Sequence, residues 1–276
     1  MRVDAPAVDR DLLDLAIDVA DRAGVLSAEL FFRGTSSSVK PDGTEVTDAD
    51  LAVEDAIRAQ LRRHVPDDAV YGEEAGGNAG TSGRRWITDP ISGTAYFTRR
   101  MPLFANLLAC EDEHGPAIGV INMPVQQEMV FAGRGRGCWL RAGDNPPCPA
   151  LVTGHTAMDG ALILAVNQHT WSEELLMALH RRVLLVGGIH HAILYVATGR
   201  VDAAVLTHQS EEDLAPLPVI LAEAGGLVTD LDGGPVRTGD GTALASNGLV
   251  HDELLGAVAG LPRTGRPKAL DRQAGR

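Results

Sequence analysis

Residues 86–94, Trp-Ile-Thr-Asp-Pro-Ile-Ser-Gly-Thr, set the tightest limits on how this chain can fold. Three strand-compatible residues lead to Asp89, and the proline after it can neither continue a helix nor donate a hydrogen bond to a neighbouring strand. Gly93 and Thr94 then provide the small residues that a tight loop needs. The pattern therefore predicts a strand that delivers the carboxylate of Asp89 to a turn.

An acid in this position suggests a metal site, and the rest of the chain supports that interpretation. A carboxylate at the end of a buried strand is a ligand for hard cations, and the N–H groups of a Gly-Thr turn can bind an anion. An isolated Asp-Pro pair in a loop more often only caps a turn. Here, however, residues 72–74 (Gly-Glu-Glu) end another short apolar run, and residues 211–213 (Glu-Glu-Asp) begin an amphipathic segment. Together the three motifs indicate a site for a metal and a phosphate.

Taken in order, these motifs resemble those of the inositol monophosphatase superfamily. The hallmark of that superfamily is Asp-Pro-Ile-Asp-Gly-Thr after a Gly-Glu-Glu motif, with a Trp-Asp helix start near the C-terminus. In this chain Ser92 stands where the second aspartate is expected, and Glu212 stands where the aromatic residue is expected. The resemblance extends from residue 40 to residue 247. Four segments look most like the histidinol-phosphate phosphatase branch: residues 83–86, 101–103, 134–137 and 197–202.

The resemblance implies roles for individual residues. The Mg²⁺ ligands would be Glu73, Asp89, the carbonyl of Ile91, and Asp213. Thr94 with Glu73 would orient the attacking water, and the N–H groups of Gly93 and Thr94 would bind the phosphate. The substrate-binding candidates are Ser92, Gly93, Thr94, His190 and Asp213.

Two further catalytic candidates, Lys40 and Asp50, match a loop that closes over the metal site in the resembled family. Without the resemblance, Asp50 could equally be a first-turn acid that the helix dipole favours.

The departures from the family pattern concern one half of the site. Ser92 offers a neutral hydroxyl where a carboxylate is expected, so we expect the second Mg²⁺ site to be weak. Glu212 could supply a substitute carboxylate or be a solvated acid at a helix start. The substrate wall at residues 187–190 is bulkier than in the family, and the adjacent His190 and His191 point to different faces of a helix, which leaves one of them as a substrate contact. His208, in the loop before residue 211, is a further candidate.

The periodicity of apolar residues predicts a meander followed by strand–helix alternation. We expect helices at residues 8–33 and 52–61, with Thr47 or Asp48 capping the second, and a flexible loop at 75–84. Further strands are expected at residues 102–110, 117–122, 128–132, 161–166, 183–186, 201–206, 227–229 and 243–245. Further helices are expected at residues 172–182, 187–198, 213–224 and 249–259.

These elements imply sheets with helices on their faces. The resemblance implies an α/β (α+β) fold, the layered αβαβα sandwich of the inositol monophosphatase and fructose-1,6-bisphosphatase type. We expect one phosphatase-like domain over residues 1–260, with an α+β half at 1–150 and an α/β half at 151–260. Residues 261–276 have the composition of a flexible tail.

Charge and cysteine content restrict the partners. The chain has 37 acidic and 24 basic residues among its 276, a formal net charge of −13, which argues against nucleic-acid and anionic membrane surfaces. Its three cysteines have no metal-ligand spacing, and their odd number favours reduced thiols in a cytoplasmic protein. No signal peptide and no apolar run of roughly 20 residues is present, so we expect no membrane partner. From the resemblance and the apolar content we expect a homodimer.

Two functions stay open at this point. The first is Mg²⁺-dependent hydrolysis of a small phosphomonoester such as histidinol phosphate, an inositol phosphate or a related metabolite phosphate. The second is a family member that has lost phosphatase activity through Ser92 and binds a ligand or catalyses a different step in a small-molecule pathway.

Overall fold

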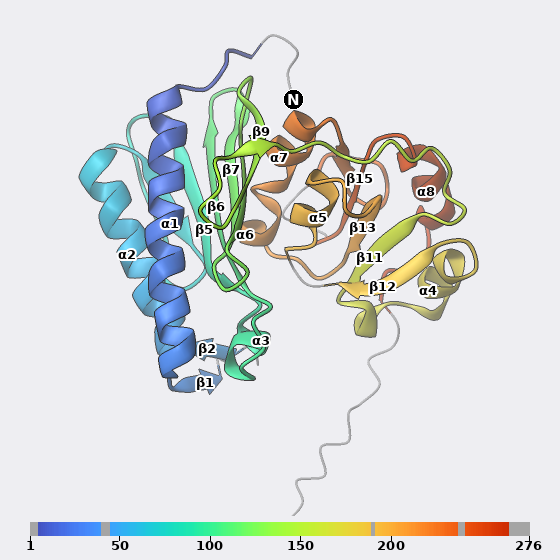
Figure 1. Ribbon diagram of the computed structural model, residues 1–276, viewed down its shortest axis with the longest axis horizontal. Helices are drawn as coiled ribbons and strands as arrows, with labels where there is room; N and C mark the ends of the chain where they lie inside the picture. The colour runs from blue at the N-terminus through green and yellow to red at the C-terminus, as the bar shows by residue number, and fades with distance from the viewer. Residues whose placement is uncertain (1–4, 40–44, 189–190, 237–240, 265–276) are drawn as a thin grey trace, which may run out of the picture.

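The computed structural model describes residues 5–39, 45–188, 191–236 and 241–264, and it shows helices and sheets in alternating layers (Figure 1). Helices α1 (Arg10–Arg33) and α2 (Asp48–His64) form the first layer. An eight-stranded sheet follows, then a layer of short helices, a five-stranded sheet and an outer layer of two helices. The predicted αβαβα sandwich is therefore confirmed.

The eight-stranded sheet contains the predicted meander. Its strand order is β10-β9-β8-β7-β6-β5-β3-β4, with β3 parallel to β5 and every other neighbouring pair antiparallel. Both faces of this sheet are covered by helices, so its inner strands are apolar on both sides. The neighbours Leu107 and Leu108 on β6 accordingly face two different cores. The strands are β3 (Ala69–Gly72), β4 (Gly76–Asn78), β5 (Arg85–Ser92), β6 (Ala105–Asp112), β7 (Gly115–Met123), β8 (Glu128–Gly133), β9 (Gly137–Ala142) and β10 (Cys148–Pro149).

The ends of the first two helices follow local sequence signals. Asp9 caps α1, and Gly34 ends it with a φ of 93°, a conformation that glycine adopts readily. Thr47, one of the two predicted caps, begins α2 in a capping box with Asp50. It follows the short antiparallel pair β1 (Ser37–Val39) and β2 (Glu45–Thr47).

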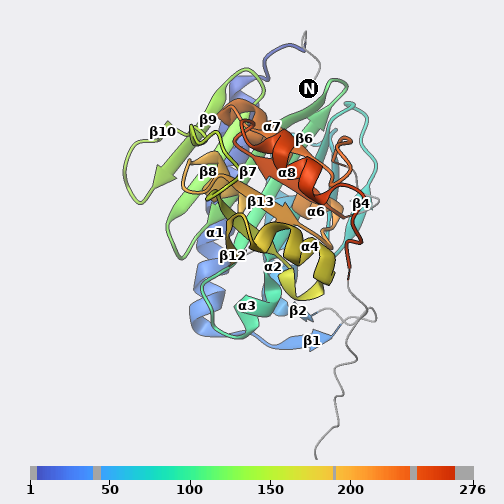
Figure 2. The same cartoon turned by 90° about the vertical axis from the view of Figure 1, so that its right-hand side faces the viewer.

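The second half of the chain forms the smaller sheet, in the order β12-β11-β13-β15-β14. Helices α4 (Glu173–His180) and α8 (His251–Val258) lie side by side over its outer face (Figure 2). Helices α5 (Ile193–Ala197), α6 (Glu211–Leu214) and α7 (Leu217–Ala224) lie between the two sheets. A 3-10 turn, η1 (Gln168–Thr170), precedes α4. The strands are β11 (Leu162–Val166), β12 (Leu184–Gly188), β13 (Ala203–Leu206), β14 (Leu227–Thr229) and β15 (Ala243–Ser246).

Three elements differ from their predictions. Residues 76–78 of the expected loop 75–84 form β4, because they pair with β3 at the edge of the sheet. Gly187 and Gly188 extend β12 beside β11 instead of starting a helix, which begins only at Ile193. The helix expected at 213–224 is two helices that meet at Pro216, since proline has no N–H to continue the first one.

The first residues of the expected tail pack against the domain. The hydroxyl of Ser172 donates to the carbonyl of Pro262 at 2.6 Å, and Arg263 pairs with Asp232. Thr264 forms an isolated β-bridge with Trp171. Residues 265–276 lie outside the described ranges. No helix in the described part of the chain is long and apolar enough to cross a membrane.

His251 connects three elements of the smaller half. Its side chain is 1% exposed at the start of α8, with Nδ1 2.9 Å from the hydroxyl of Ser246 on β15. Nε2 lies 3.1 Å from the hydroxyl of Thr229 on β14. Burial lowers the pKa of His251, and the charge of Asp252 offsets part of that effect. The imidazole therefore favours its neutral form in the folded protein.

We expect the free energy of unfolding to decrease as the pH falls below the ordinary histidine pKa of about 6.5. Because the folded-state pKa of His251 is depressed, the unfolded chain takes up this proton first, and acid favours unfolding. One proton gives a slope of at most about 1.4 kcal/mol per pH unit. Urea denaturation between about pH 7.5 and 5 should show a flatter profile for His251→Asn than for wild type. The exposed His180→Asn control should keep the wild-type slope, and equal slopes in all three proteins would contradict the expectation.

Candidate functional site

The Asp-Pro-Ile-Ser motif lies at the end of β5, where the strand is irregular. Asp89 pairs with Leu107 and Ser92 with Ala105, so Pro90 and Ile91 face one residue of β6. The strand was predicted to turn at Asp89, but it continues to Ser92, because this bulge accommodates the proline without a ladder bond. The N–H of Ile91 donates to Asp89 Oδ1 at 3.0 Å and turns the carboxylate along the strand.

Gly93 makes the sharp turn after the bulge. Its φ of 94° is a backbone conformation that residues with a Cβ rarely adopt. A Cβ at this position would also lie 3.0 Å from the carbonyl oxygen of Leu103, so there is no room for a larger residue. The short helix α3 (Thr94–Thr98) starts directly after it. The N–H groups of a first helical turn have no partner within the helix. This turn therefore presents N–H groups at the end of β5, the strand that carries Asp89.

Thr94 and Asp50 meet at this turn. The hydroxyl of Thr94 lies 3.3 Å from Asp50 Oδ1 and 3.2 Å from the carbonyl of Ile91. The other oxygen of Asp50 accepts from Thr47, at 2.8 Å from its N–H and 2.6 Å from its hydroxyl. Asp50 is therefore a first-turn acid of α2, and the same carboxylate also contacts Thr94 of the motif; its catalytic role stays a prediction.

The late acidic motif joins the site from the other half of the chain. Asp213 lies in the first turn of α6, where its Oδ2 accepts from the N–H and the hydroxyl of Ser210, each at 3.2 Å. Its Oδ1 accepts a hydrogen bond from the hydroxyl of Ser92 at 3.1 Å. Two residues 121 positions apart are therefore neighbours.

A residue that the sequence analysis missed, Glu54, fixes the turn that carries Glu73. The buried carboxylate of Glu54 accepts from the N–H groups of Glu74 and Ala75 at 2.8 and 3.0 Å. A Cβ at Gly72 would lie 2.4 Å from that carboxylate, so the Gly-Glu-Glu motif needs its glycine for this contact. Glu54 is four residues after Asp50, on the same face of α2, and this spacing was the available signal.

Burial and neighbouring charges raise the pKa values of two acids of the site, Asp89 and Asp50. Asp89 is 4% exposed, and its pKa is well above the ordinary range because of burial and then the charges of Glu73, Asp213 and Asp50. A hydrogen bond with Glu73 acts in the same direction. Burial also raises the pKa of Asp50, partly offset by the hydrogen bonds from Thr47. The geometry thus concentrates negative charge in a desolvated place.

The oxygen donors here are of the kind that hard cations prefer. The first implied set contains Glu73, Asp89 and the carbonyl of Ile91, and the second contains Asp89, Asp213 and Ser92. Each set has only two carboxylates. This agrees with the finding that, within the described ranges, no three His, Cys, Asp or Glu side chains form a group that could hold a metal ion. The mutual repulsion around Asp89 nevertheless fits a cation, because a positive charge there would relieve it.

The structure excludes one of the two roles considered for Glu212, that of a solvated acid at a helix start. It is 5% exposed, so it is not a solvated acid. Together with Glu211 it raises the pKa of Tyr71, to which it is hydrogen-bonded, so it faces β3. Glu211 pairs with Arg85 at 2.5 and 3.0 Å. The acids at the start of α6 therefore contact separate partners on β3 and β5, and only Asp213 contacts the motif's serine.

Of the four lysine and histidine candidates, the described residues include two, His191 and His208. Lys40 and His190 lie outside the described residues. His191 is buried beside the start of α5, and His208 is exposed in the loop before α6 with a φ of 55°.

Comparison with known proteins agrees with this arrangement. The chain matches the model of the inositol monophosphatase family over residues 9–261. A histidinol-phosphatase of Mycobacterium tuberculosis (strain ATCC 25618 / H37Rv) is 38% identical over 255 residues, which cover 90% of this chain and 98% of that protein. A histidinol-phosphatase of Streptomyces coelicolor (strain ATCC BAA-471 / A3(2) / M145) is 34% identical over 257 residues, covering 89% of this chain and 96% of that protein.

A solved IMPase structure from Thermotoga maritima has a TM-score of 0.79 and 26% identity, covering 90% of this chain and 96% of that chain. The resemblance inferred from the motifs is therefore confirmed at the level of sequence and of fold. Since the family match includes every described acid of the site, from Asp50 to Asp213, the chain belongs to the inositol monophosphatase family.

Proposed function

We propose that this protein is a Mg²⁺-dependent phosphatase of a small phosphomonoester. The observation that carries the proposal is the convergence of Asp89, Glu73, Asp213 and Asp50 beside the Gly93 turn. Acids alone would repel a phosphate ester, so a cation must lie between them and the substrate. Family membership and the names of the two histidinol-phosphatase relatives support the same reaction class.

The residues present fit one strong and one weak metal site. Glu73, Asp89 and the carbonyl of Ile91 would hold the first ion. Asp89, Asp213 and the hydroxyl of Ser92 would hold a second ion more weakly, because that hydroxyl stands where the family has a carboxylate and already donates to Asp213. When bound, Mg²⁺ polarises a phosphoryl oxygen, lowers the pKa of a coordinated water and neutralises the leaving alkoxide.

The side chains of this protein then orient the reactants. The hydroxyl of Thr94, which lies beside Asp50 and the carbonyl of Ile91, would hold the attacking water together with Glu73. Burial raises the pKa of Asp50, partly offset by its hydrogen bonds from Thr47, and a raised pKa favours the acceptance of a proton relative to an ordinary aspartate. The N–H groups of Gly93 and Thr94 would bind the phosphate oxygens as a first helical turn does.

Histidinol phosphate is the first substrate to test. The two relatives named above are histidinol-phosphatases, and each aligns over nearly its whole length. Inositol phosphates and related metabolite phosphates are the next candidates, because the family description names inositol monophosphatase.

The alternative function is ligand binding, or a different reaction, without hydrolysis. One observation favours it: the hydroxyl of Ser92 donates a hydrogen bond to Asp213. The second donor set therefore has one negative charge fewer than the family pattern, and one oxygen of Asp213 is already occupied. The substrate wall after Gly188 also departs from the family pattern.

The test is metal-dependent phosphate release from histidinol phosphate, inositol phosphates and nucleotide phosphates, with Mg²⁺ titrated and EDTA as the control. Release from one ester that requires Mg²⁺ supports the phosphatase. Mg²⁺ binding without release from any ester supports the alternative.

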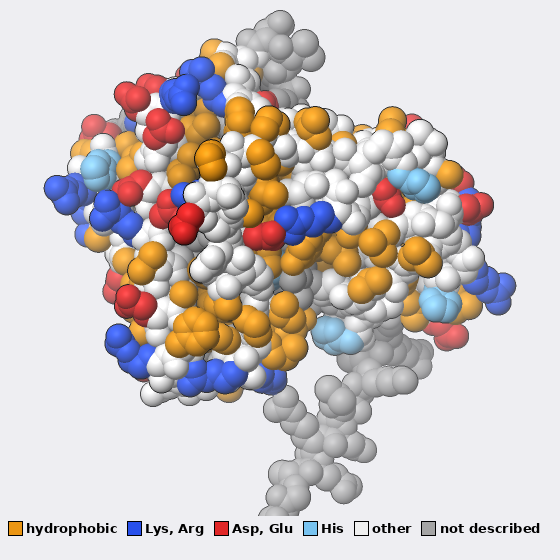
Figure 3. Space-filling view, in the orientation of Figure 1, with side chains coloured by type: hydrophobic (Ala, Val, Ile, Leu, Met, Phe, Trp, Pro, Cys, Tyr) orange, Lys and Arg blue, Asp and Glu red, His pale blue; other side chains and the backbone are white. Residues whose placement is uncertain are grey.

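We also expect a cytoplasmic homodimer that binds neither nucleic acid nor membranes. Apolar side chains gather over the lower ends of α1 and α3 on the face shown in Figure 3, and Phe32 on α1 is 70% exposed. Acidic and basic side chains are interspersed on the same face, with no continuous basic surface there. Light scattering should give about twice the mass of 29.1 kDa, and a monomer at all concentrations would contradict this expectation.

A further inference from the structure

Asn106 is a buried amide in an otherwise apolar strand, and it lies opposite the bulge of the motif. It is 2% exposed between Ala105 and Leu107 on β6. The register of β5 and β6 leaves Pro90 and Ile91 facing this one residue. The backbone of one residue on β6 cannot form ladder hydrogen bonds with both Pro90 and Ile91, so the carbonyl of Pro90 needs another donor.

The side chain of Asn106 supplies that donor. Its Nδ2 donates to the carbonyl of Pro90 at 2.6 Å and to the hydroxyl of Ser27 on α1 at 3.1 Å. Both N–H bonds of the amide are thereby used. The hydroxyl of Ser27 lies 3.1 Å from the carbonyl oxygen of Gly24, so it can donate to this carbonyl within α1 while it accepts from Asn106.

A second amide, Asn122, extends these contacts. It is the direct partner of Asn106 on β7, and its Nδ2 donates to the carbonyl of Ala20 at 2.8 Å. The same group lies 3.5 Å from Asn106 Oδ1. A Cβ at Gly24 would lie 2.2 Å from the Asn122 amide, so this glycine makes room for it. Ser27, Asn106 and Asn122 form what we call the Asn106 network.

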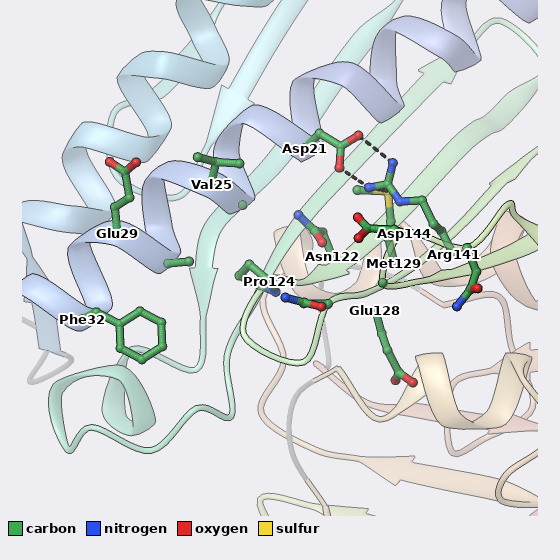
Figure 4. Close-up of a pocket in the computed structure, with 15 residues that line it drawn as sticks. Asp21, Val25, Glu29, Phe32, Asn122, Pro124, Glu128, Met129, Arg141 and Asp144 are labelled. Atoms are coloured by element: carbon green, nitrogen blue, oxygen red, sulfur yellow. Dashed lines mark hydrogen bonds and ion pairs between the residues drawn. The ribbon is translucent and has the colours of Figure 1, made fainter.

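The network reaches from the motif to a surface cavity. Asn122 lies beneath α1 in the wall of a cavity of about 740 Å³, beside Pro124 and the ion pair of Asp21 with Arg141 (Figure 4). None of the residues that line this cavity belongs to the Asp-Pro-Ile-Ser motif. The network therefore anchors the bulge to α1, the longest helix of the described chain.

We infer that Asn106 is a positioning residue, which holds the Pro90–Ile91 peptide so that the Ile91 carbonyl and the Asp89 carboxylate face the same cation. The inference rests on the proposed function. A peptide bond is planar, so fixing the carbonyl of Pro90 also fixes the N–H of Ile91, which in turn holds Asp89 Oδ1. The contact thus acts on both expected ligands that flank Pro90, the carboxylate of Asp89 and the carbonyl of Ile91. Outer contacts of this kind commonly change metal affinity about 10- to 100-fold.

A purely structural role makes a different prediction. Loss of the amide would then lower stability but leave the folded protein with its Mg²⁺ affinity unchanged. A matched control exists on the same strand pair: the hydroxyl of Thr88 donates to the carbonyl of Leu107 at 2.8 Å, where the ladder is regular. Thr88→Val removes a buried bond of the same kind without altering the bulge.

The experiment compares wild type, Asn106→Leu and Thr88→Val. Mg²⁺ alone is titrated by calorimetry into each folded protein, and phosphate release is measured against Mg²⁺ concentration. For Asn106→Leu we expect a Mg²⁺ dissociation constant at least about tenfold larger than that of wild type. We expect kcat at subsaturating metal to fall with it, while KM for the ester at saturating metal stays near the wild-type value. Thr88→Val should keep the wild-type Mg²⁺ dissociation constant.

Ser27→Ala provides a second variant if Asn106→Leu does not fold. It keeps the Asn106 amide but removes its anchor on α1, and we expect Mg²⁺ affinity to fall about two- to fivefold. If whichever of Asn106→Leu and Ser27→Ala folds binds Mg²⁺ as tightly as wild type, the inference is wrong while the proposed function still stands. Equal losses in the network variant and Thr88→Val would also overturn it. If wild type itself neither binds Mg²⁺ nor releases phosphate, the proposed function fails and this inference with it.

Discussion

Asp89→Asn is expected to reduce Mg²⁺-dependent phosphate release by at least about a hundredfold, while the metal-free protein becomes more stable. Asp89 belongs to both implied donor sets, so the loss of its charge weakens each of them. In the metal-free protein the same charge is unfavourable, because it is buried among the carboxylates of Glu73, Asp213 and Asp50. Removing it should raise the free energy of unfolding by about 1 kcal/mol or more. For a domain of this size, that corresponds to an increase of roughly 2–4 °C in Tm.

The two effects are measured on the same protein. Thermal unfolding is recorded in EDTA and in excess Mg²⁺, and phosphate release is measured in parallel. Wild type should gain stability with Mg²⁺, whereas Asp89→Asn should be more stable without the ion and gain little from it. Asp144→Asn, on the exposed turn after β9, removes one charge far from the motif and should behave as wild type. Retained turnover in Asp89→Asn would show that the chemistry lies elsewhere in the molecule.

Ser92→Asp should have the opposite effects on both quantities. It replaces the hydroxyl bond to Asp213 with a third carboxylate beside Asp89 and Asp213. Without metal, the added charge should destabilise the fold. With Mg²⁺, the second donor set becomes fully anionic, and we expect affinity to rise about tenfold, or about 1.4 kcal/mol.

Activity then separates the two proposed functions. A phosphatase limited by its second ion should release phosphate faster at low Mg²⁺ in the Ser92→Asp variant. A site remodelled for another reaction should bind Mg²⁺ more tightly without releasing phosphate, because a substrate wall that misplaces the ester by about 1 Å still prevents reaction.

Ser92→Asn is the matched control for this experiment. It has nearly the size of aspartate and no charge, so a gain that appears in both variants comes from shape and not from charge. Unchanged Mg²⁺ affinity in Ser92→Asp would mean that the second donor set is not where the family pattern places it.

Local patterns in the sequence were sufficient for much of this protein. The strand leading to Asp89, the end of the first helix at residue 33 and Thr47 as one of two possible caps of α2 depend on residues a few positions apart, and the structure agrees with each of these predictions. The family motifs also identified Asp50, Thr94 and Asp213, which the structure brings to the same turn. Whether they hold Mg²⁺ stays a prediction.

Other features depended on partners that are distant in the sequence. Residues 76–78 and Gly187–Gly188 have weak local preferences, and neighbouring strands made them β4 and the end of β12. Glu212 has the sequence context of a solvated acid at a helix start, but it is buried and contacts Tyr71 on β3, because α6 packs against the neighbouring strand β5.

The Asn106 network shows the same division between sequence and tertiary structure. The sequence determined that a proline would interrupt β5, since a missing N–H is a property of the residue itself. Only the tertiary structure decided which side chain would donate to the buried carbonyl of Pro90. The register of β6 places Asn106 opposite it, 16 residues away in the sequence, and α1 brings Ser27 to Asn106 across 79 residues. The local sequence determines how the backbone bends at a proline. The hydrogen-bond partners of that bend depend on how helices and sheets pack together, which short sequence patterns do not encode.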